Sequence, residues 1–163
     1  MYKIIISTFL TLSLNSMLLQ AENLSYSFMG TQTSVSSYND VTAQSFGIKF
    51  GKQIDTWRTA LSVNYENSEG NALASILLQA DKGIFENLFQ KSQYQPYLGF
   101  NLGILQHKEA KSNLGYGYGL NTGITYIFNH DFDLDLGYRI MRVNQIDNIN
   151  TMKNLTLSLH YFY

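Results

Sequence analysis

The sequence of 163 residues contains no cysteine, and this absence excludes several kinds of protein at once. A chain without thiols has no disulfide framework, no thiolate metal site, no cysteine nucleophile and no lipid anchor attached through cysteine. Proline occurs once, and only 14% of the residues are charged, whereas 45% are hydrophobic and 14% are aromatic. This composition is typical of a single strand-rich domain.

An excess of charge of one sign is also absent. The formal net charge is −1, whereas nucleic-acid-binding proteins usually carry a basic patch, so we expect no nucleic-acid partner. The three histidines are His107, His130 and His160, and no pair of them has the spacing of metal ligands. We therefore expect neither a metal site nor a cofactor.

One long hydrophobic run is present, and it lies at the N-terminus. Lys3, the run IIISTFLTLSLNSMLL and the letters LQA before Glu22 predict an export signal over residues 1–21, so that residues 22–163 form one mature domain. An N-terminal transmembrane anchor is the alternative, because the run approaches the length of a membrane span. No second long apolar stretch follows residue 21.

In the rest of the chain, apolar and polar residues alternate with a period of two residues. In FDLDLGYR, residues 132–139, apolar residues alternate with Asp133, Asp135, Gly137 and Arg139, so a strand here has one apolar and one charged face. Eight segments of this kind fit the mature length at about 10 residues per membrane strand. The residues expected on the outward parity are Leu24, Tyr26, Phe28; Phe46, Ile48, Phe50; Trp57, Leu61, Val63, Tyr65; Ala72, Ala74, Ile76, Leu78; Leu98, Phe100, Leu102, Ile104; Tyr116, Tyr118, Leu120, Ile124, Tyr126; Phe132, Leu134, Leu136, Tyr138; and Leu155, Leu157, Leu159, Tyr161, Tyr163.

Two features indicate that the apolar parity faces lipid. Glycines are concentrated on the polar parity, as a narrow eight-stranded interior requires, and aromatic residues are concentrated near strand ends, as at membrane interfaces. Membrane barrels place apolar residues outside and polar residues inside, the reverse of a soluble lipocalin-like barrel. We predict an all-β fold, an eight-stranded antiparallel up-and-down transmembrane β-barrel, whose polar interior is filled by side chains and passes no large solute.

The run GYGYGLNTGITYIFNHDFDLDLGYRI resembles the penultimate hairpin of OmpA-like, OmpX-like and opacity-type outer-membrane barrels. The C-terminal LTLSLHYFY resembles the signal that the barrel-assembly machinery recognises in outer-membrane proteins, with Tyr161 and Tyr163 as its aromatic residues. The resemblance implies a location in the outer membrane of a Gram-negative bacterium. It also implies outer-membrane lipid, lipopolysaccharide and the assembly machinery as partners, with a host or surface ligand as a further partner.

The positions of the two chain ends predict which connections face the periplasm. An even-stranded barrel with a removed export signal has both ends there, so residues 53–55, 82–95 and 129–131 form periplasmic connections. Residues 33–42, 67–70, 107–113 and 144–150 then form the outside loops. Ile84, Phe85, Leu88 and Phe89 in the second periplasmic connection fit either a short amphipathic helix over residues 83–93 or a hydrophobic loop packed under the barrel.

Charged residues on the inward parity predict an ion network across the interior. Its members are Lys49, Arg58, Glu66, Asp133, Asp135 and Arg139. Matching their heights along the strands pairs Arg58 with Asp133, Lys49 with Asp135 and Arg139 with Glu66.

The function expected from these features is non-enzymatic: a structural or surface-interaction role of the adhesion type, with no catalytic residue. A lipid-A-modifying barrel enzyme is the first alternative, because His107, Glu109 and Ser112 share an outside loop, although the closely spaced His-x-Ser arrangement of the deacylases is absent. A secreted lipocalin-like carrier is the second alternative.

Deletion of Tyr163 is expected to prevent assembly while export across the inner membrane continues. An incomplete terminal strand leaves backbone groups unpaired in lipid at several kcal/mol each, and the aromatic end is the expected recognition signal. The measurement is the amount of heat-modifiable protein in the outer membrane. A normal amount after the deletion contradicts the barrel assignment.

Overall fold

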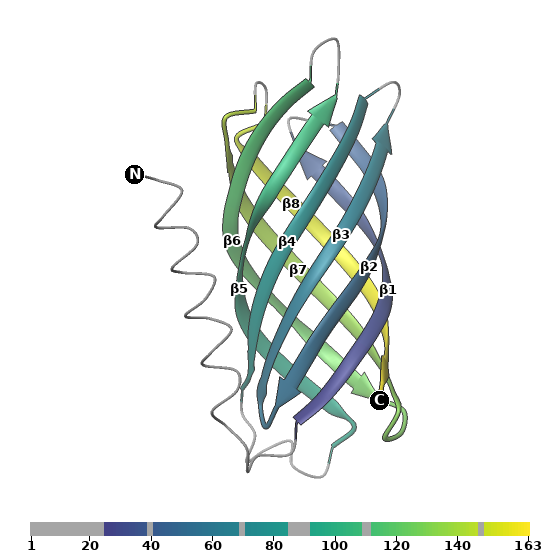
Figure 1. The fold of residues 1–163 in the computed structure, drawn as a ribbon. Coiled ribbons are helices and arrows are strands. Elements are labelled where there is room, and N and C mark those ends of the chain that lie inside the picture. The colour runs from purple at the N-terminus through teal and green to yellow at the C-terminus, as the bar shows by residue number, and fades with distance from the viewer. Residues whose placement is uncertain (1–24, 39–40, 69–70, 85–91, 109–111, 147–148) are drawn as a thin grey trace, which may run out of the picture.

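In the computed structural model, backbone hydrogen bonds join the strands into a closed barrel without a break (Figure 1). Each strand pairs antiparallel with its neighbours in sequence, and β8 pairs with β1 to close the barrel. The structure describes residues 25–38, 41–68, 71–84, 92–108, 112–146 and 149–163. The strands are β1 (Ser25–Tyr38), β2 (Val41–Ile54), β3 (Trp57–Ser68), β4 (Asn71–Gly83), β5 (Tyr94–Lys108), β6 (Ser112–Ile127), β7 (Phe132–Asn144) and β8 (Thr151–Phe162). The predicted fold class is confirmed.

Two predictions concern residues that the structure does not describe. The export signal over residues 1–21 lies outside the described residues, and so does most of the segment for which a helix was considered, residues 85–91.

Within the described part of the chain, no helix is long and apolar enough to cross a membrane.

The outer surface of the barrel is apolar and the inner surface carries the charges. Large hydrophobic side chains of every strand are exposed, such as Phe46 (61%) on β2 and Leu120 (66%) on β6, whereas Lys49 and Asp135 are only 3% exposed. This arrangement is that of a barrel surrounded by lipid. It contradicts the lipocalin-like alternative, which requires apolar side chains inside and charges outside.

The first strand differs from the prediction in both parity and length. Phe28, expected to face lipid, is fully buried inside the barrel, and Val35 on the opposite parity is 45% exposed. Residues 33–42 do not form an outside loop, because β1 continues to Tyr38 and pairs there with Val41 at the start of β2. The cause is the composition of TQTSVSS, residues 31–37, in which both parities carry mainly small polar side chains and the alternation is weak.

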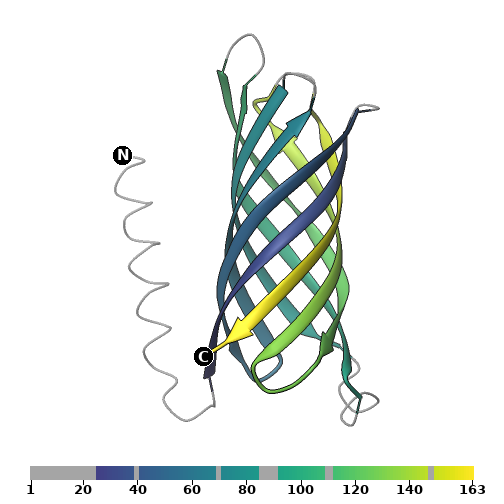
Figure 2. The same cartoon turned by 90° about the vertical axis from the view of Figure 1, so that its right-hand side faces the viewer.

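The interior has two zones along the barrel axis. We call the end where β1 begins and β8 ends the terminal end (Figures 1 and 2). Apart from Glu66, the buried charged residues belong to the strand segments between this end and the middle of the barrel. Toward the opposite end the inward residues are mainly apolar and form one cluster: Tyr38, Ala43, Leu73, Leu77, Leu105, Met141, Val143, Ile146, Ile149 and Met152. The prediction of a polar interior missed this apolar plug, beside which polar residues such as Ser36, Glu66 and Asn154 are also buried.

Glycines make space for the large inward side chains. Tyr97 on β5 stands beside Gly123 on β6, which in turn stands beside Gly137 on β7. A Cβ atom on either glycine would meet the Tyr97 hydroxyl. The tyrosine ring therefore lies across both glycines and reaches Asp135, to which its hydroxyl donates a hydrogen bond of 3.1 Å.

Substituting Gly123→Val is expected to destabilise the barrel by about 1–3 kcal/mol, the usual cost of overpacking, because the new side chain displaces Tyr97. The measurement is the midpoint of urea unfolding in detergent, followed by the fluorescence of Trp57, the one tryptophan. Gly83→Val is the matched control, since a Cβ there makes only ordinary contacts with Thr56. Equal losses of stability in the two variants contradict the explanation that Gly123 makes space for Tyr97.

Candidate functional site: the charged interior

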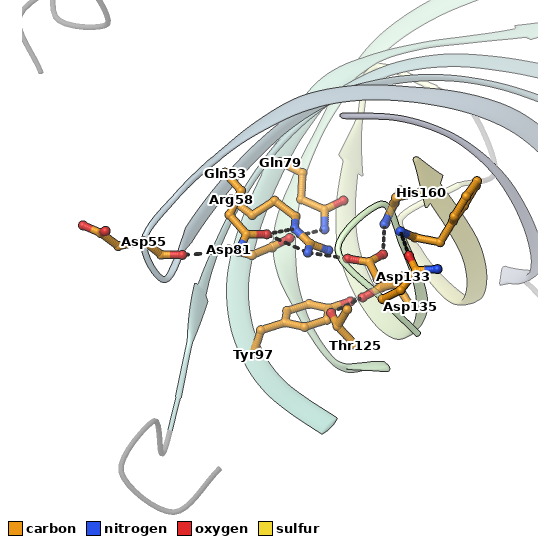
Figure 3. A network of polar contacts seen from close by, with 12 residues as sticks. Gln53, Asp55, Arg58, Gln79, Asp81, Tyr97, Thr125, Asp133, Asp135 and His160 are labelled. Atoms are coloured by element: carbon orange, nitrogen blue, oxygen red, sulfur yellow. Dashed lines mark hydrogen bonds and ion pairs between the residues drawn. The ribbon is translucent and has the colours of Figure 1, made fainter. Parts of the chain in front are cut away.

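The centre of the charged zone is Asp133, which binds two cationic or potentially cationic side chains (Figure 3). Arg58 Nη2 donates to Asp133 Oδ2 at 2.7 Å, and Asp133 Oδ1 lies 2.7 Å from His160 Nδ1. Gln53 Oε1 accepts from the same guanidinium group at 2.8 and 3.2 Å. These contacts hold the arginine side chain in one orientation across the barrel.

Aromatic rings surround this group on the side of the seam between β1 and β8. The Arg58 guanidinium carbon lies 5.3 Å from the ring centre of Phe28 and 5.6 Å from that of Phe162. The Phe28 ring is also 4.9 Å from the His160 ring. Cation–π contacts and a low-polarity surrounding both strengthen a buried ion pair.

Asp135 is held by hydroxyl groups and not by a direct ion pair. Its carboxylate accepts from the Tyr97 hydroxyl at 3.1 Å and from Thr125 Oγ1 at 3.2 Å. Lys49 faces the same cavity of about 10 Å³ as Asp135, but among the described residues Lys49 forms no ion pair. Lys49 and Asp135, the expected partners, thus line one cavity but do not form an ion pair with each other.

Arg139 has a different partner from the one expected. Its Nη2 donates to Gln79 Oε1 at 2.8 Å, and it forms no ion pair with Glu66 in the described part of the barrel. Glu66 instead lies near Tyr38, a member of the apolar plug. Matching heights as if the strands were upright is the error, because the strands cross the barrel obliquely (Figure 1).

A second chain of polar contacts continues from Gln79. Gln79 Nε2 donates to Asp81 Oδ2 at 2.7 Å, and Asn121 Nδ2 donates to Asp81 Oδ1 at 2.5 Å. Asn101 Nδ2 then donates to Asn121 Oδ1 at 3.2 Å. The sequence interpretation placed Gln79 and Asp81 on the inward parity but did not include them in the network, although Asp81 is charged and faces the same interior.

The remaining predicted residues lie on the outside of the barrel. Tyr161 is 44% exposed and Tyr163 is 66% exposed, so both face the surroundings of the barrel near its terminal end. They belong to an aromatic band in which Tyr161 contacts Phe132 and Tyr163 at ring distances of 5.2 and 6.3 Å. Recognition of these residues by the assembly machinery stays a prediction.

Of the three residues of the enzymatic alternative, the structure describes the side chain of His107 alone. His107 lies on the inner face of β5 and is 6% exposed. Glu109 and the side chain of Ser112 lie outside what the structure describes. His160 is fully buried between Asp133 and Phe28, so a substrate has no access to it. The charged interior neutralises and orients buried groups, and this geometry suits stability better than catalysis.

Comparison with solved structures identifies the class of protein that this fold defines. Neisserial surface protein A is similar over 85% of this chain and 97% of its own, with 22% identity and a TM-score of 0.67. Outer membrane protein H (OprH) from P. aeruginosa is similar over 85% and 99%, with 18% identity and a TM-score of 0.63. The Yersinia pestis attachment invasion locus protein, Ail, is similar over 87% and 99%, with 14% identity and a TM-score of 0.51.

No protein-family model and no curated protein sequence matches the chain. The chain has the fold of the small eight-stranded outer-membrane β-barrels, which is the fold that its resemblance implied. The same solved structures support the expected location in the outer membrane of a Gram-negative bacterium.

Arg58→Met is expected to lower the free energy of unfolding in detergent by about 3–5 kcal/mol, because removing one partner of a buried ion pair leaves the other charge uncompensated. The double variant with Asp133→Asn should recover part of this loss. Lys108→Ala, an exposed cation, is the control and should change stability by less than about 0.5 kcal/mol. Urea titration of the wild type, Arg58→Met, Asp133→Asn and the double variant measures the coupling, and additive losses contradict the ion pair as a stabilising contact.

Proposed function

We propose that this protein is a non-enzymatic outer-membrane barrel that associates with lipopolysaccharide and presents its outer rim for surface interactions. The single observation that carries the proposal is the wall of the barrel, which is apolar around its middle and bears cations near the end opposite the termini. Such a wall suits a protein whose partners approach from the membrane and from the cell surface.

Two outward-facing cations lie close together near that end. Arg142 on β7 pairs across the sheet with Thr151 on β8, and Lys153 is two residues further along β8. Both side chains are exposed and face outward on the same side of the sheet. Neighbouring Arg and Lys side chains bind phosphate through charge-assisted hydrogen bonds, and the phosphates of lipid A lie at this level of an outer membrane.

Three connections at that end are short, and their length limits how a surface ligand can contact the barrel. Residues 39–40, 69–70 and 109–111 are all that separate the strands of three hairpins. A ligand from a host or a neighbouring surface therefore meets the strand ends more than long loops. An adhesion-type role agrees with the name of one similar structure, the attachment invasion locus protein, and is proposed on that likeness of fold.

Lipopolysaccharide is expected to raise the thermal unfolding midpoint of the refolded barrel more than a phospholipid of equal chain length does. The variant Arg142→Ala/Lys153→Ala should lose most of this difference, because it lacks the two phosphate-binding cations. The control variant Lys52→Ala/Lys82→Ala removes two cations near the terminal end and should retain it. Equal effects of the two variants overturn the proposed contact.

The same lipopolysaccharide, recovered and analysed by mass spectrometry, should carry unchanged lipid A. A change in its acyl chains overturns the non-enzymatic assignment and favours the lipid-A-modifying alternative.

A further inference from the structure

The terminal end of the barrel contains a cavity that the ion network does not fill. Its volume is about 300 Å³, and its lining includes Gln53, Arg58, Asp81, Gln95 and Tyr97. A neighbouring cavity of about 210 Å³ shares Gln53, Arg58 and Gln95 with it. We call the two together the inner vestibule. A volume of this size is at the lower end of the range for small-molecule sites.

The vestibule does not continue through the barrel between the described strands. The cavities deeper in the interior measure about 10 and 20 Å³, which is close to the space of a single water molecule. The apolar plug follows them toward the opposite end. A small molecule in the vestibule therefore enters and leaves at the terminal end.

Asp81 is the unusual residue of the vestibule. It is 5% exposed, it lines the larger cavity, and both of its carboxylate oxygens accept hydrogen bonds from neutral amides, those of Gln79 and Asn121. Among the described residues it has no cation within ion-pair distance. Buried carboxylates are normally paired with a cation, because burial of an unpaired charge is costly.

The cation nearest to Asp81 in the sheet already binds other side chains. Arg58 is its direct cross-strand neighbour on β3, but the guanidinium group donates its hydrogen bonds to Asp133 and Gln53 (Figure 3). Lys49 faces the small cavity deeper in the barrel together with Asp135. Asp81 thus lines the cavity with no cation within ion-pair distance among the described residues, and the one cation that lines the same cavity, Arg58, is bonded to other groups.

We propose that the inner vestibule binds a small aliphatic primary amine, whose ammonium group pairs with Asp81. An ammonium group has three donors, which suit the free acceptor positions of the Asp81 carboxylate and the amide oxygen of Gln95, which lines the same cavity. The apolar part of the ligand contacts Ile84, Pro96 and the ring of Tyr97, which line the same cavity. Such a site is separate from the outer rim and does not depend on it.

The test is a titration of the refolded full-length mature barrel in zwitterionic detergent, followed by backbone NMR shifts. n-Butylammonium is expected to give saturable shifts at vestibule residues, whereas n-butanol, its neutral counterpart, and butyrate are expected to give none. Equal saturable binding of n-butanol overturns the ionic recognition, and no saturable shift with n-butylammonium overturns the site.

Two matched variants test whether the negative charge of Asp81 is needed for binding. Asp81→Asn should weaken n-butylammonium binding about tenfold or more, the size expected for loss of a charge-assisted hydrogen bond. Asp131→Asn removes an exposed carboxylate in the β6–β7 connection and should leave the affinity unchanged. Unchanged affinity in Asp81→Asn overturns the proposal.

Gly83→Leu provides an independent variant if Asp81→Asn does not refold, as judged by heat-modifiable mobility. Gly83 lines the larger cavity, and a Cβ there has only ordinary contacts, so the leucine side chain fits and occupies ligand space. Loss of binding with Asp81 intact supports the vestibule as the site, and full retention of binding overturns it.

Discussion

A membrane interior offers no water to an unpaired backbone group, and the rest of this structure depends on that constraint. Every strand must have two neighbours, and the pairing of β1 with β8, from Phe28 with Phe162 to Ser37 with Lys153, completes the ring. Closure with eight strands leaves an interior just wide enough for side chains. The width explains why glycines accompany the large inward residues: a Cβ on Gly51 would meet the Phe28 ring, just as one on Gly123 would meet Tyr97.

A narrow closed interior also decides how its charges are arranged. Most charges that face inward are buried, so they are stable where other side chains neutralise or hydrogen-bond them. Asp133 receives both Arg58 and His160, whereas Asp135 is satisfied by hydroxyl groups and Asp81 by amides. Apolar side chains predominate toward the opposite end, where polar pairs such as Ser34 with Ser45 and Asn154 with Ser36 hydrogen-bond to each other.

The fold was predictable from the sequence because alternation is strong in most strands, and the choice of Ile76 and Leu78 as outward residues of β4 agrees with their exposures of 47% and 48%. The prediction failed at β1, where serine and threonine occupy both parities. Which charges meet was less predictable, because the oblique course of the strands is not visible in the alternation. The apolar plug and Tyr97 did leave a signal: Leu73 and Met141 are apolar residues on an otherwise polar parity, and Tyr97 is an aromatic residue on the parity of Gly99 and Gly103.

The short connections at the end opposite the termini have a consequence for what reaches this protein on a cell. Only residues 39–40, 69–70 and 109–111 separate the strands of three hairpins at this end, so these three connections are short. A coat of long polysaccharide chains would cover such a protein and keep antibodies and other large molecules at a distance. On a cell whose surface sugars are short, the same strand ends would be open to contact, so the length of the neighbouring glycans controls access to the protein.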